Sequence, residues 1–293
     1  MKRLPPEDAA AKAEAWLRDN GFTSLPVDLE RVASILEIEV QPLKQTQPGV
    51  SGMLISHMGV FGIMFGTYVK SIGFQRFSIA HEIGHYLLEG HAEHLFPPGI
   101  TSHSSQAGFT SVDPYEQEAD NFAAGLLMPT KPFKKLMGRS RLGFADIEAV
   151  RDACKTSLTT TAIRYAELTD DAIAVILSTG RTIDYCILSE AMKSLPDLAW
   201  LKRGSPVPAK TTTERFNADE SRVLKAERDE DDIDVLDWLG GKRSSMVTEE
   251  VVGLGRYGKT LTVLSSQKIG QEAYDDDGDD DDLIERWTPG LKK

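Results

Sequence analysis

Cysteine is scarce in this chain, which has two, Cys154 and Cys186, in 293 residues. They form no C-x-x-C pair and have no histidine nearby in the sequence. A disulfide framework or a thiolate metal site therefore has little support. We expect both thiols to be reduced and partly buried.

Long hydrophobic runs are missing as well. No apolar stretch approaches the roughly 18 residues that a helix needs to span a bilayer. The opening segment, MKRLPPEDAAAKAEAWL, has prolines and acids where a secretory signal has an apolar core. We therefore expect a cytoplasmic protein that does not engage a membrane.

A surplus of positive charge is also absent, since the net charge is -12. Residues 271–293 hold nine acids and three bases, which is half of that charge. A chain with this balance repels phosphate, so we expect no direct contact with nucleic acid. The acidic run cannot bury enough apolar surface to order itself, and we expect a disordered tail over residues 271–293.

The length is sufficient for about two domains. Up to residue 168 the pattern is mostly helical, with short glycine-punctuated apolar runs between residues 38 and 66 that predict a small antiparallel sheet. Strand-like runs dominate afterwards. We expect an α+β protein with a helical domain over residues 1–168, a smaller α/β domain of regulatory character over 169–270, and the tail.

The most unusual stretch is FSIAHEIGHYLLEGH, residues 77–91, which crowds three histidines and two glutamates into an apolar, helix-like segment. His81 and His85 are four residues apart, so a helix presents both imidazoles on one face. This spacing suits two corners of a tetrahedral divalent site. Glu82 projects beside the pair, where it can accept a proton from water instead of binding the ion. The H-E-x-x-H pattern is typical of metal-dependent hydrolases.

Chance is the competing explanation, because an H-E-x-x-H string arises in about one chain in a hundred at ordinary residue frequencies. The neighbours argue against it. Ile79, Ala80, Ile83 and Leu87 indicate a buried helix, in which unpaired ionisable groups would be costly. We therefore interpret the stretch as half of a metal site, with Ser78 as a candidate N-cap of its helix.

A catalytic metal needs a third protein ligand. His91 has the position of the last histidine in H-E-x-x-H-x-x-G-x-x-H, but Leu88 stands where that pattern needs glycine. The segment YEQEADNFAAGLLMP offers Glu116, which we favour, with Glu118 as a further alternative. Zinc suits such a site best, although Mn²⁺, iron or cobalt also fit a shell of two histidines and one glutamate.

Two further assignments follow from the same segments. Asp120 is four residues after Glu116 and shares its helical face, so we expect it to hold the outer nitrogen of a ligating histidine. His103 stands in a serine-rich stretch, expected as a loop, and is a candidate for stabilising an oxyanion; His57 and His94 are expected at the surface. The runs VSGMLISH and VFGIMFG are candidates for an exposed sheet edge that could hold a substrate as an added strand.

Four segments, in this order and spacing, carry a family resemblance: PVDLERVASILEIEV, GVSGML, QRFSIAHEIGHYLLEGH and EQEADNFAAGLLMP. Together they resemble the ImmA/IrrE family of metallo-endopeptidases over roughly residues 25–165. The resemblance implies a gluzincin-like site in which His81, His85 and Glu116 bind the metal and Glu82 is the catalytic base. It also implies cleavage of helix-turn-helix repressors of the Xre class, which relieves repression of stress-response or mobile-element genes.

Position 120 departs from the resemblance, since Asp120 stands where many members have asparagine; this makes its role beside a histidine chemically easier. Two rival functions remain open. One is a non-catalytic binding protein with a structural metal site that sequesters a repressor. The other is a transcription factor that uses residues 145–167 as a helix-turn-helix, which the mixed charge of that segment disfavours. The oligomeric state and the natural substrate stay open.

Overall fold

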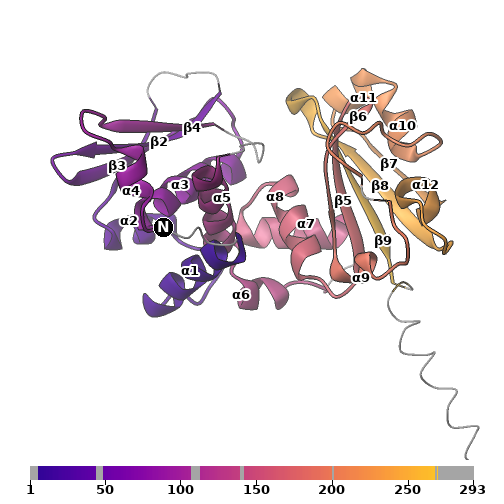
Figure 1. Cartoon of the computed structure of the whole chain (residues 1–293), viewed down its shortest axis with the longest axis horizontal. Helices are drawn as coiled ribbons and strands as arrows, with labels where there is room; N and C mark the ends of the chain where they lie inside the picture. The colour runs from indigo at the N-terminus through magenta and orange to yellow at the C-terminus, as the bar shows by residue number, and fades with distance from the viewer. Residues whose placement is uncertain are drawn as a thin grey trace, which may run out of the picture. The chain divides into compact units, whose positions relative to one another are not determined.

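A computed structural model describes residues 6–43, 49–106, 113–138, 142–199, 201–267 and 269. The expected acidic tail, residues 271–293, lies outside the described residues. The chain divides into two compact units (Figure 1). Unit 1 comprises Met1–Arg139 and Ile147–Arg164, and unit 2 comprises Ser140–Asp146 and Tyr165–Lys293. Both contain helices and a sheet, so the predicted α+β class is confirmed. The predicted domain boundary between residues 168 and 169 stays a prediction.

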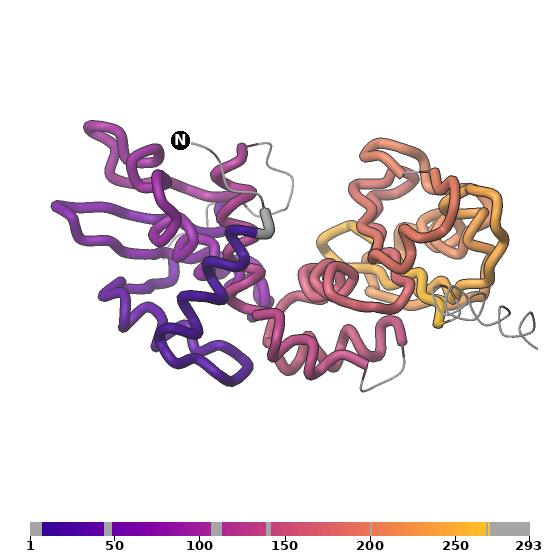
Figure 2. Tube along the Cα trace, turned by 60° about the horizontal axis from the view of Figure 1, so that its bottom comes forward, coloured from indigo at the N-terminus to yellow at the C-terminus, as the bar shows by residue number. Residues whose placement is uncertain are grey.

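Unit 1 is built on three long helices and several shorter ones. The long helices are α1 (Pro6–Asp19), α3 (Ile72–Leu87) and α5 (Pro114–Leu127), and the shorter ones are α2 (Leu29–Ile35), α4 (His91–Leu95) and α6 (Thr130–Lys134). Helices α7 (Phe144–Cys154) and α8 (Leu158–Leu168) each have residues in both units. Helix α1, indigo in Figure 2, packs against α5. Gly125 permits this close approach, because a Cβ there would lie 2.5 Å from the carbonyl oxygen of Ala10.

The sheet of unit 1 has four strands in the order β1-β3-β2-β4. They are β1 (Glu39–Pro42), β2 (Val50–His57), β3 (Val60–Phe65) and β4 (Ser102–Gln106). The expectation of a purely antiparallel sheet was wrong in one respect, since β1 pairs parallel with β3. The chain passes from α2 into β1, and the β2–β3 hairpin then brings β3 back beside β1 in the same direction. Helices α3 and α4 follow β3 and precede β4.

Helix α3 carries the H-E-x-x-H pattern and begins earlier than expected. Its N-cap is Ser71, whose hydroxyl accepts a hydrogen bond from the backbone N–H of Phe74. The prediction of Ser78 as N-cap was therefore wrong. Ser78 is buried inside the helix and donates to the carbonyl of Phe74, an arrangement that satisfies its hydroxyl without ending the helix. At helix α2 the N-cap is Asp28, whose side-chain carboxylate accepts a hydrogen bond from the backbone N–H of Arg31.

Unit 2 is a five-stranded sheet in the order β6-β5-β9-β8-β7, covered by short helices. Its strands are β5 (Ala172–Thr179), β6 (Thr182–Leu188), β7 (Arg228–Asp234), β8 (Met246–Gly253) and β9 (Thr260–Ser266). Its short helices are α9 (Glu190–Lys193), α10 (Thr212–Asn217), α11 (Glu220–Leu224), α12 (Val235–Leu239) and the 3₁₀ turn η1 (Gly255–Tyr257).

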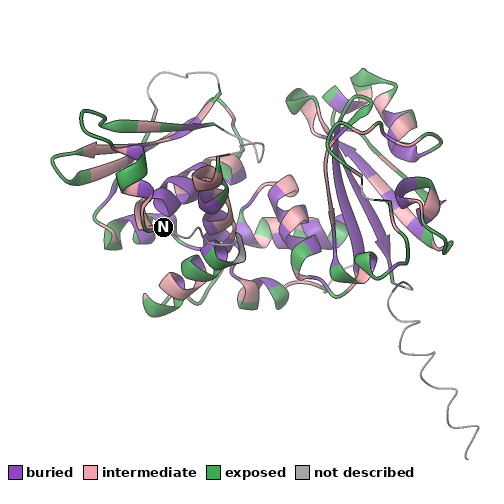
Figure 3. Cartoon of the chain, viewed as in Figure 1, coloured by how far each residue is buried: buried purple, intermediate pink, exposed green. Residues whose placement is uncertain are grey.

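All strand pairs described in unit 2 are antiparallel, which corrects the α/β description of this part to α+β. Antiparallel neighbours need no crossover helix, so the intervening helices are short. The central strands β5 and β9 are buried almost throughout, as Figure 3 shows in purple. Trp238 on α12 packs into the same core.

Both cysteines are free thiols, as expected. Cys154 is fully buried and Cys186 partly so. Burial raises the pKa of each thiol to about 12. Over the described residues, no helix combines the length and the apolar character that crossing a bilayer would require.

Candidate metal centre

Two helices bring three candidate ligands to one point. Helix α3 supplies His81 and His85 from successive turns, and α5 supplies Glu116 from its first turn. One ligand atom from each lies within 4.8 Å of the other two. The Nε2 atoms of the two histidines are 3.0 Å apart, and they lie 3.3 Å and 3.2 Å from the carboxylate oxygens of Glu116. The helical phasing that favoured Glu116 over Glu118 thus matches the geometry.

A carboxylate holds the outer face of His81. Its Nδ1 lies 2.8 Å from Oδ1 of Asp120, one turn along α5 from Glu116. The expected contact between Asp120 and a histidine of the pair is therefore confirmed. Because an ionised carboxylate only accepts hydrogen bonds, the proton of a neutral His81 belongs on Nδ1, which leaves the Nε2 lone pair facing inward.

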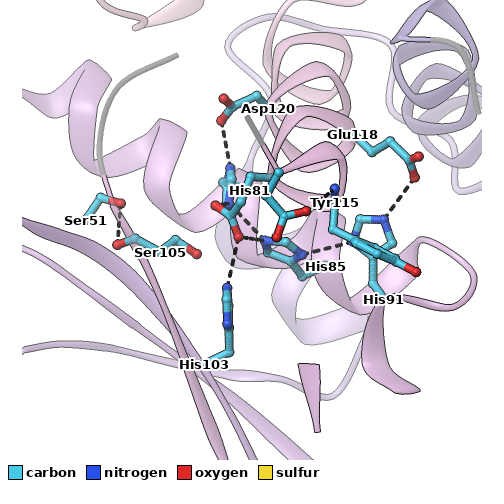
Figure 4. A network of polar contacts seen from close by, with 11 residues as sticks. Ser51, His81, His85, His91, His103, Ser105, Tyr115, Glu118 and Asp120 are labelled. Atoms are coloured by element: carbon cyan, nitrogen blue, oxygen red, sulfur yellow. Dashed lines mark hydrogen bonds and ion pairs between the residues drawn. The ribbon is translucent and has the colours of Figure 1, made fainter. Parts of the chain in front are cut away.

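His91 and Glu118, the two rejected ligand candidates, form a second line behind His85. The Nδ1 atoms of His85 and His91 are 2.9 Å apart, and Nε2 of His91 lies 3.1 Å from a carboxylate oxygen of Glu118. Figure 4 shows these contacts leading from His85 to His91 and Glu118, away from His81. If Nδ1 of His85 donates to His91, then His91 donates through Nε2 to Glu118, so every proton has an acceptor. His91 thus lies behind the ligand cluster.

The donor set fits a divalent cation. Three electron-pair donors, two imidazole nitrogens and a carboxylate, lie 3.0–3.3 Å from one another. A cation between them would bind their lone pairs and offset their mutual repulsion. Burial works against protonation of His81, but its hydrogen bonds with Asp120 and Glu116 outweigh burial and raise its pKa to about 10. The surrounding carboxylates therefore favour positive charge at this imidazole.

The other two members of the cluster are held in the ionisation states that metal ligands need. Burial is the main reason that the pKa of His85 falls to about 3, so its imidazole is neutral at physiological pH. Burial alone would raise the pKa of Glu116, yet its hydrogen bonds with His103, His81 and His85 hold that pKa well below its usual range. Glu116 is therefore an anion.

Glu82 is fully buried beside the cluster. By strict geometry neither of its carboxylate oxygens has a hydrogen-bond partner among the described side chains and backbone, although the hydroxyl of Ser105 lies close enough to lower the pKa of Glu82. Burial raises the pKa of Glu82 to about 7, with partial offset from His81. A buried carboxylate with two open acceptor sites and a pKa near neutrality has the properties of a general base for a water molecule.

His103 belongs to the site, although its surroundings differ from those expected. It stands on strand β4, in place of the expected loop, and its Nε2 lies 3.0 Å from Oε1 of Glu116. His57 and His94 are exposed, as expected. Tyr115 is a residue that sequence reasoning missed: its ring packs edge-on against His91 and stacks on His94. Its place directly before Glu116 is the only sequence signal for that role.

Two comparisons relate the chain to known proteins. Residues 36–152 match the family model described as the IrrE N-terminal-like domain, a peptidase family. A solved structure named as a Mycobacterium tuberculosis transcriptional regulator is similar, with a TM-score of 0.54 and 13% sequence identity, over 88% of this chain and 76% of that chain. At this identity the likeness concerns the fold alone. No curated protein matches the sequence.

Proposed function

We propose that this chain, whose residues 36–152 match the IrrE N-terminal-like peptidase model, is a zinc-dependent endopeptidase of the ImmA/IrrE type. The ligands are His81, His85 and Glu116, and the general base is Glu82. The observation that carries the proposal is the convergence of three ligand atoms beside a buried, unpartnered carboxylate. Mn²⁺ is the alternative ion that the same donor set accepts.

The residues divide the chemistry of peptide-bond hydrolysis between them. A bound zinc ion would polarise the scissile carbonyl and lower the pKa of a water molecule. Glu82 accepts the proton from water and passes it to the leaving amine, a transfer that its pKa near 7 suits. Asp120 and the His91–Glu118 pair fix the orientation of the two imidazoles. His103, whose Nε2 lies 3.0 Å from Oε1 of Glu116, is placed to donate a hydrogen bond to an oxyanion.

The sheet edge beside these groups is β4, and this revises where a substrate would bind. The candidate edges VSGMLISH and VFGIMFG were wrong, because β2 lies between β3 and β4, and β3 lies between β1 and β2. Strand β4 pairs only with β2 among the described strands and carries His103. An extended peptide that adds to β4 would pass directly over the ligand cluster.

The substrate that we propose is an Xre-type helix-turn-helix repressor, so cleavage relieves repression of stress-response or mobile-element genes. The structural neighbour named as a transcriptional regulator is in keeping with such a role. We assign catalysis to residues 1–168 and a regulatory role to residues 169–270. A cytoplasmic location follows from a repressor substrate, and direct contact with nucleic acid is not required.

The test compares wild-type protein with Glu82→Gln. Each is incubated with zinc and with small Xre-type regulators encoded beside its gene, and both cleavage and DNA binding by the regulator are measured. Cleavage by wild type alone supports the proposal. Equal relief of DNA binding by both proteins, without cleavage, would replace it with sequestration by a non-catalytic binding protein.

A further inference from the structure

Gly52, on strand β2, lies directly against the side chain of Glu82. A Cβ built on Gly52 would be within 3.0 Å of the Cγ of Glu82 and closer still to its Oε1. Both residues are buried, and α3 and β2 come from different parts of the chain. The absence of a single methyl group at position 52 therefore creates the space that the Glu82 carboxylate fills.

Backbone conformation gives no other reason for glycine at this position. Gly52 is not among the glycines with positive φ, so the backbone geometry there is open to alanine. It also sits beside a β-bulge, where the pairing of β2 with β4 shifts between Val50 and Gly52. Bulges near active sites commonly re-aim a side chain or a strand segment. What excludes a side chain at position 52 is the carboxylate of Glu82.

Strand β2 cannot retreat cheaply from a methyl group at this position. Gly52 is paired with Phe65 on one side and Ser105 on the other. The adjacent Ser51 is held by its hydroxyl, which donates to the carbonyl of Ser105 at 3.1 Å, and by its own carbonyl, which accepts from the N–H of Gly66 at 2.7 Å. The mobile partner in such a collision is the Glu82 side chain.

We propose that Gly52 is a positioning residue: its missing side chain fixes where the Glu82 carboxylate lies relative to the ligand cluster. The inference rests on the proposed function for its catalytic consequence, but not for the contact itself. Gly52→Ala should displace the base while leaving His81, His85 and Glu116 in place. A displacement of about 1 Å in a catalytic group can lower the rate about 100-fold.

The kinetic experiment measures peptide cleavage and bound zinc for wild type, Gly52→Ala and a matched control. The control is Gly62→Ala in the neighbouring strand β3, where a Cβ would meet only the carbonyl of Glu39 at 3.7 Å, an ordinary contact. We expect Gly52→Ala to lower kcat about 100-fold with KM and zinc stoichiometry unchanged. Gly62→Ala should match wild type. A kcat equal to that of wild type in folded, zinc-loaded Gly52→Ala would overturn the proposal.

A stability cycle tests the contact independently of any activity. The Tm of the full-length protein is measured for wild type, Gly52→Ala, Glu82→Ala and the double variant, following the thermal transition that zinc raises. Overpacking should lower the Tm of Gly52→Ala by about 2–12 °C. In the Glu82→Ala background the same methyl should have almost no effect, because the atoms that it meets are gone.

The two readouts separate the possible failures. Equal Tm losses from Gly52→Ala in both backgrounds would refute the contact with Glu82, whatever the activity. If no repressor is cleaved by wild type but the Tm cycle shows the expected coupling, the proposed function fails and the steric role of Gly52 stands. Should Gly52→Ala fold too poorly to assay, the double variant is expected to recover the fold, and its failure to do so would also count against the proposal.

Discussion

Replacing His91 with alanine should weaken metal binding without removing a metal ligand. His91 is fully buried and lies between the ligand candidate His85 and the carboxylate of Glu118. When Nε2 of His85 binds a cation, its Nδ1 must carry a proton, and that proton needs an acceptor. In His91→Ala the acceptor is gone, and Glu118 also loses its donor.

The size of the effect follows from burial. A buried donor left without a partner costs about 1–3 kcal/mol, and each 1.4 kcal/mol corresponds to a factor of about ten in Kd. Because Nδ1 of His85 must carry a proton only while Nε2 binds the metal, the cost falls mainly on the metal-bound state. We therefore expect the Kd for zinc to rise about 5- to 150-fold, while one zinc ion still binds per chain.

The assay is competition for zinc with a chromogenic chelator. The matched control is His94→Ala, an exposed histidine on the same short helix that stacks on Tyr115, and its Kd should equal that of wild type. His91→Gln should recover part of the loss, since an amide can both accept and donate. An unchanged Kd for His91→Ala would refute the reasoning, and complete loss of zinc would make His91 a ligand.

Three further predictions concern other parts of the structure. Glu116→Ala should abolish zinc binding and Glu118→Ala should retain it, as measured by metal content after dialysis; the reverse result would overturn the ligand assignment. Chelation of zinc should lower the free energy of unfolding by about 4 kcal/mol relative to protein in free zinc at 1,000 times Kd, measured by denaturant titration. With a pKa near 12, Cys154 and Cys186 should have about 10³-fold less thiolate at pH 8 than an ordinary cysteine. Alkylation of the native protein should therefore be slow, should accelerate as pH rises, and should become fast in guanidinium; rapid labelling at pH 8 would contradict their burial.

Local periodicity explains why the core of the site could be predicted. Four-residue spacing on a helix is enough to place His81 beside His85, and the same rule places Glu116 and Asp120 on one face of α5. Which second element faces the histidines is a tertiary fact, yet the apolar pattern of α5 indicated a buried helix and limited the choices. The roles of His91 and Glu118 depend on how the chain turns after α3, which no periodicity encodes.

Two strands have little signal in the sequence, for the same physical reason. Strand β4, with the sequence SHSSQ, and strand β7, with the sequence RDEDDID, lie at sheet edges and lack the apolar alternation that marks a half-buried strand. Their backbone pairing, which is invisible in composition, holds them in place. An isolated glycine in a strand indicates a bulge or a close approach of another group, but the sequence does not say that the group beside Gly52 is Glu82.

The turn between α3 and α4 gives the candidate metal centre a way to change its affinity without a change in the three ligand residues. Gly90, with φ of +83°, reverses the chain so that His91 returns to face His85 only six positions earlier. The affinity for an ion at this candidate site would therefore depend on the length of one short connection. Lengthening or shortening that connection by a single residue would retune how long the cation resides, while every atom that touches it stayed the same.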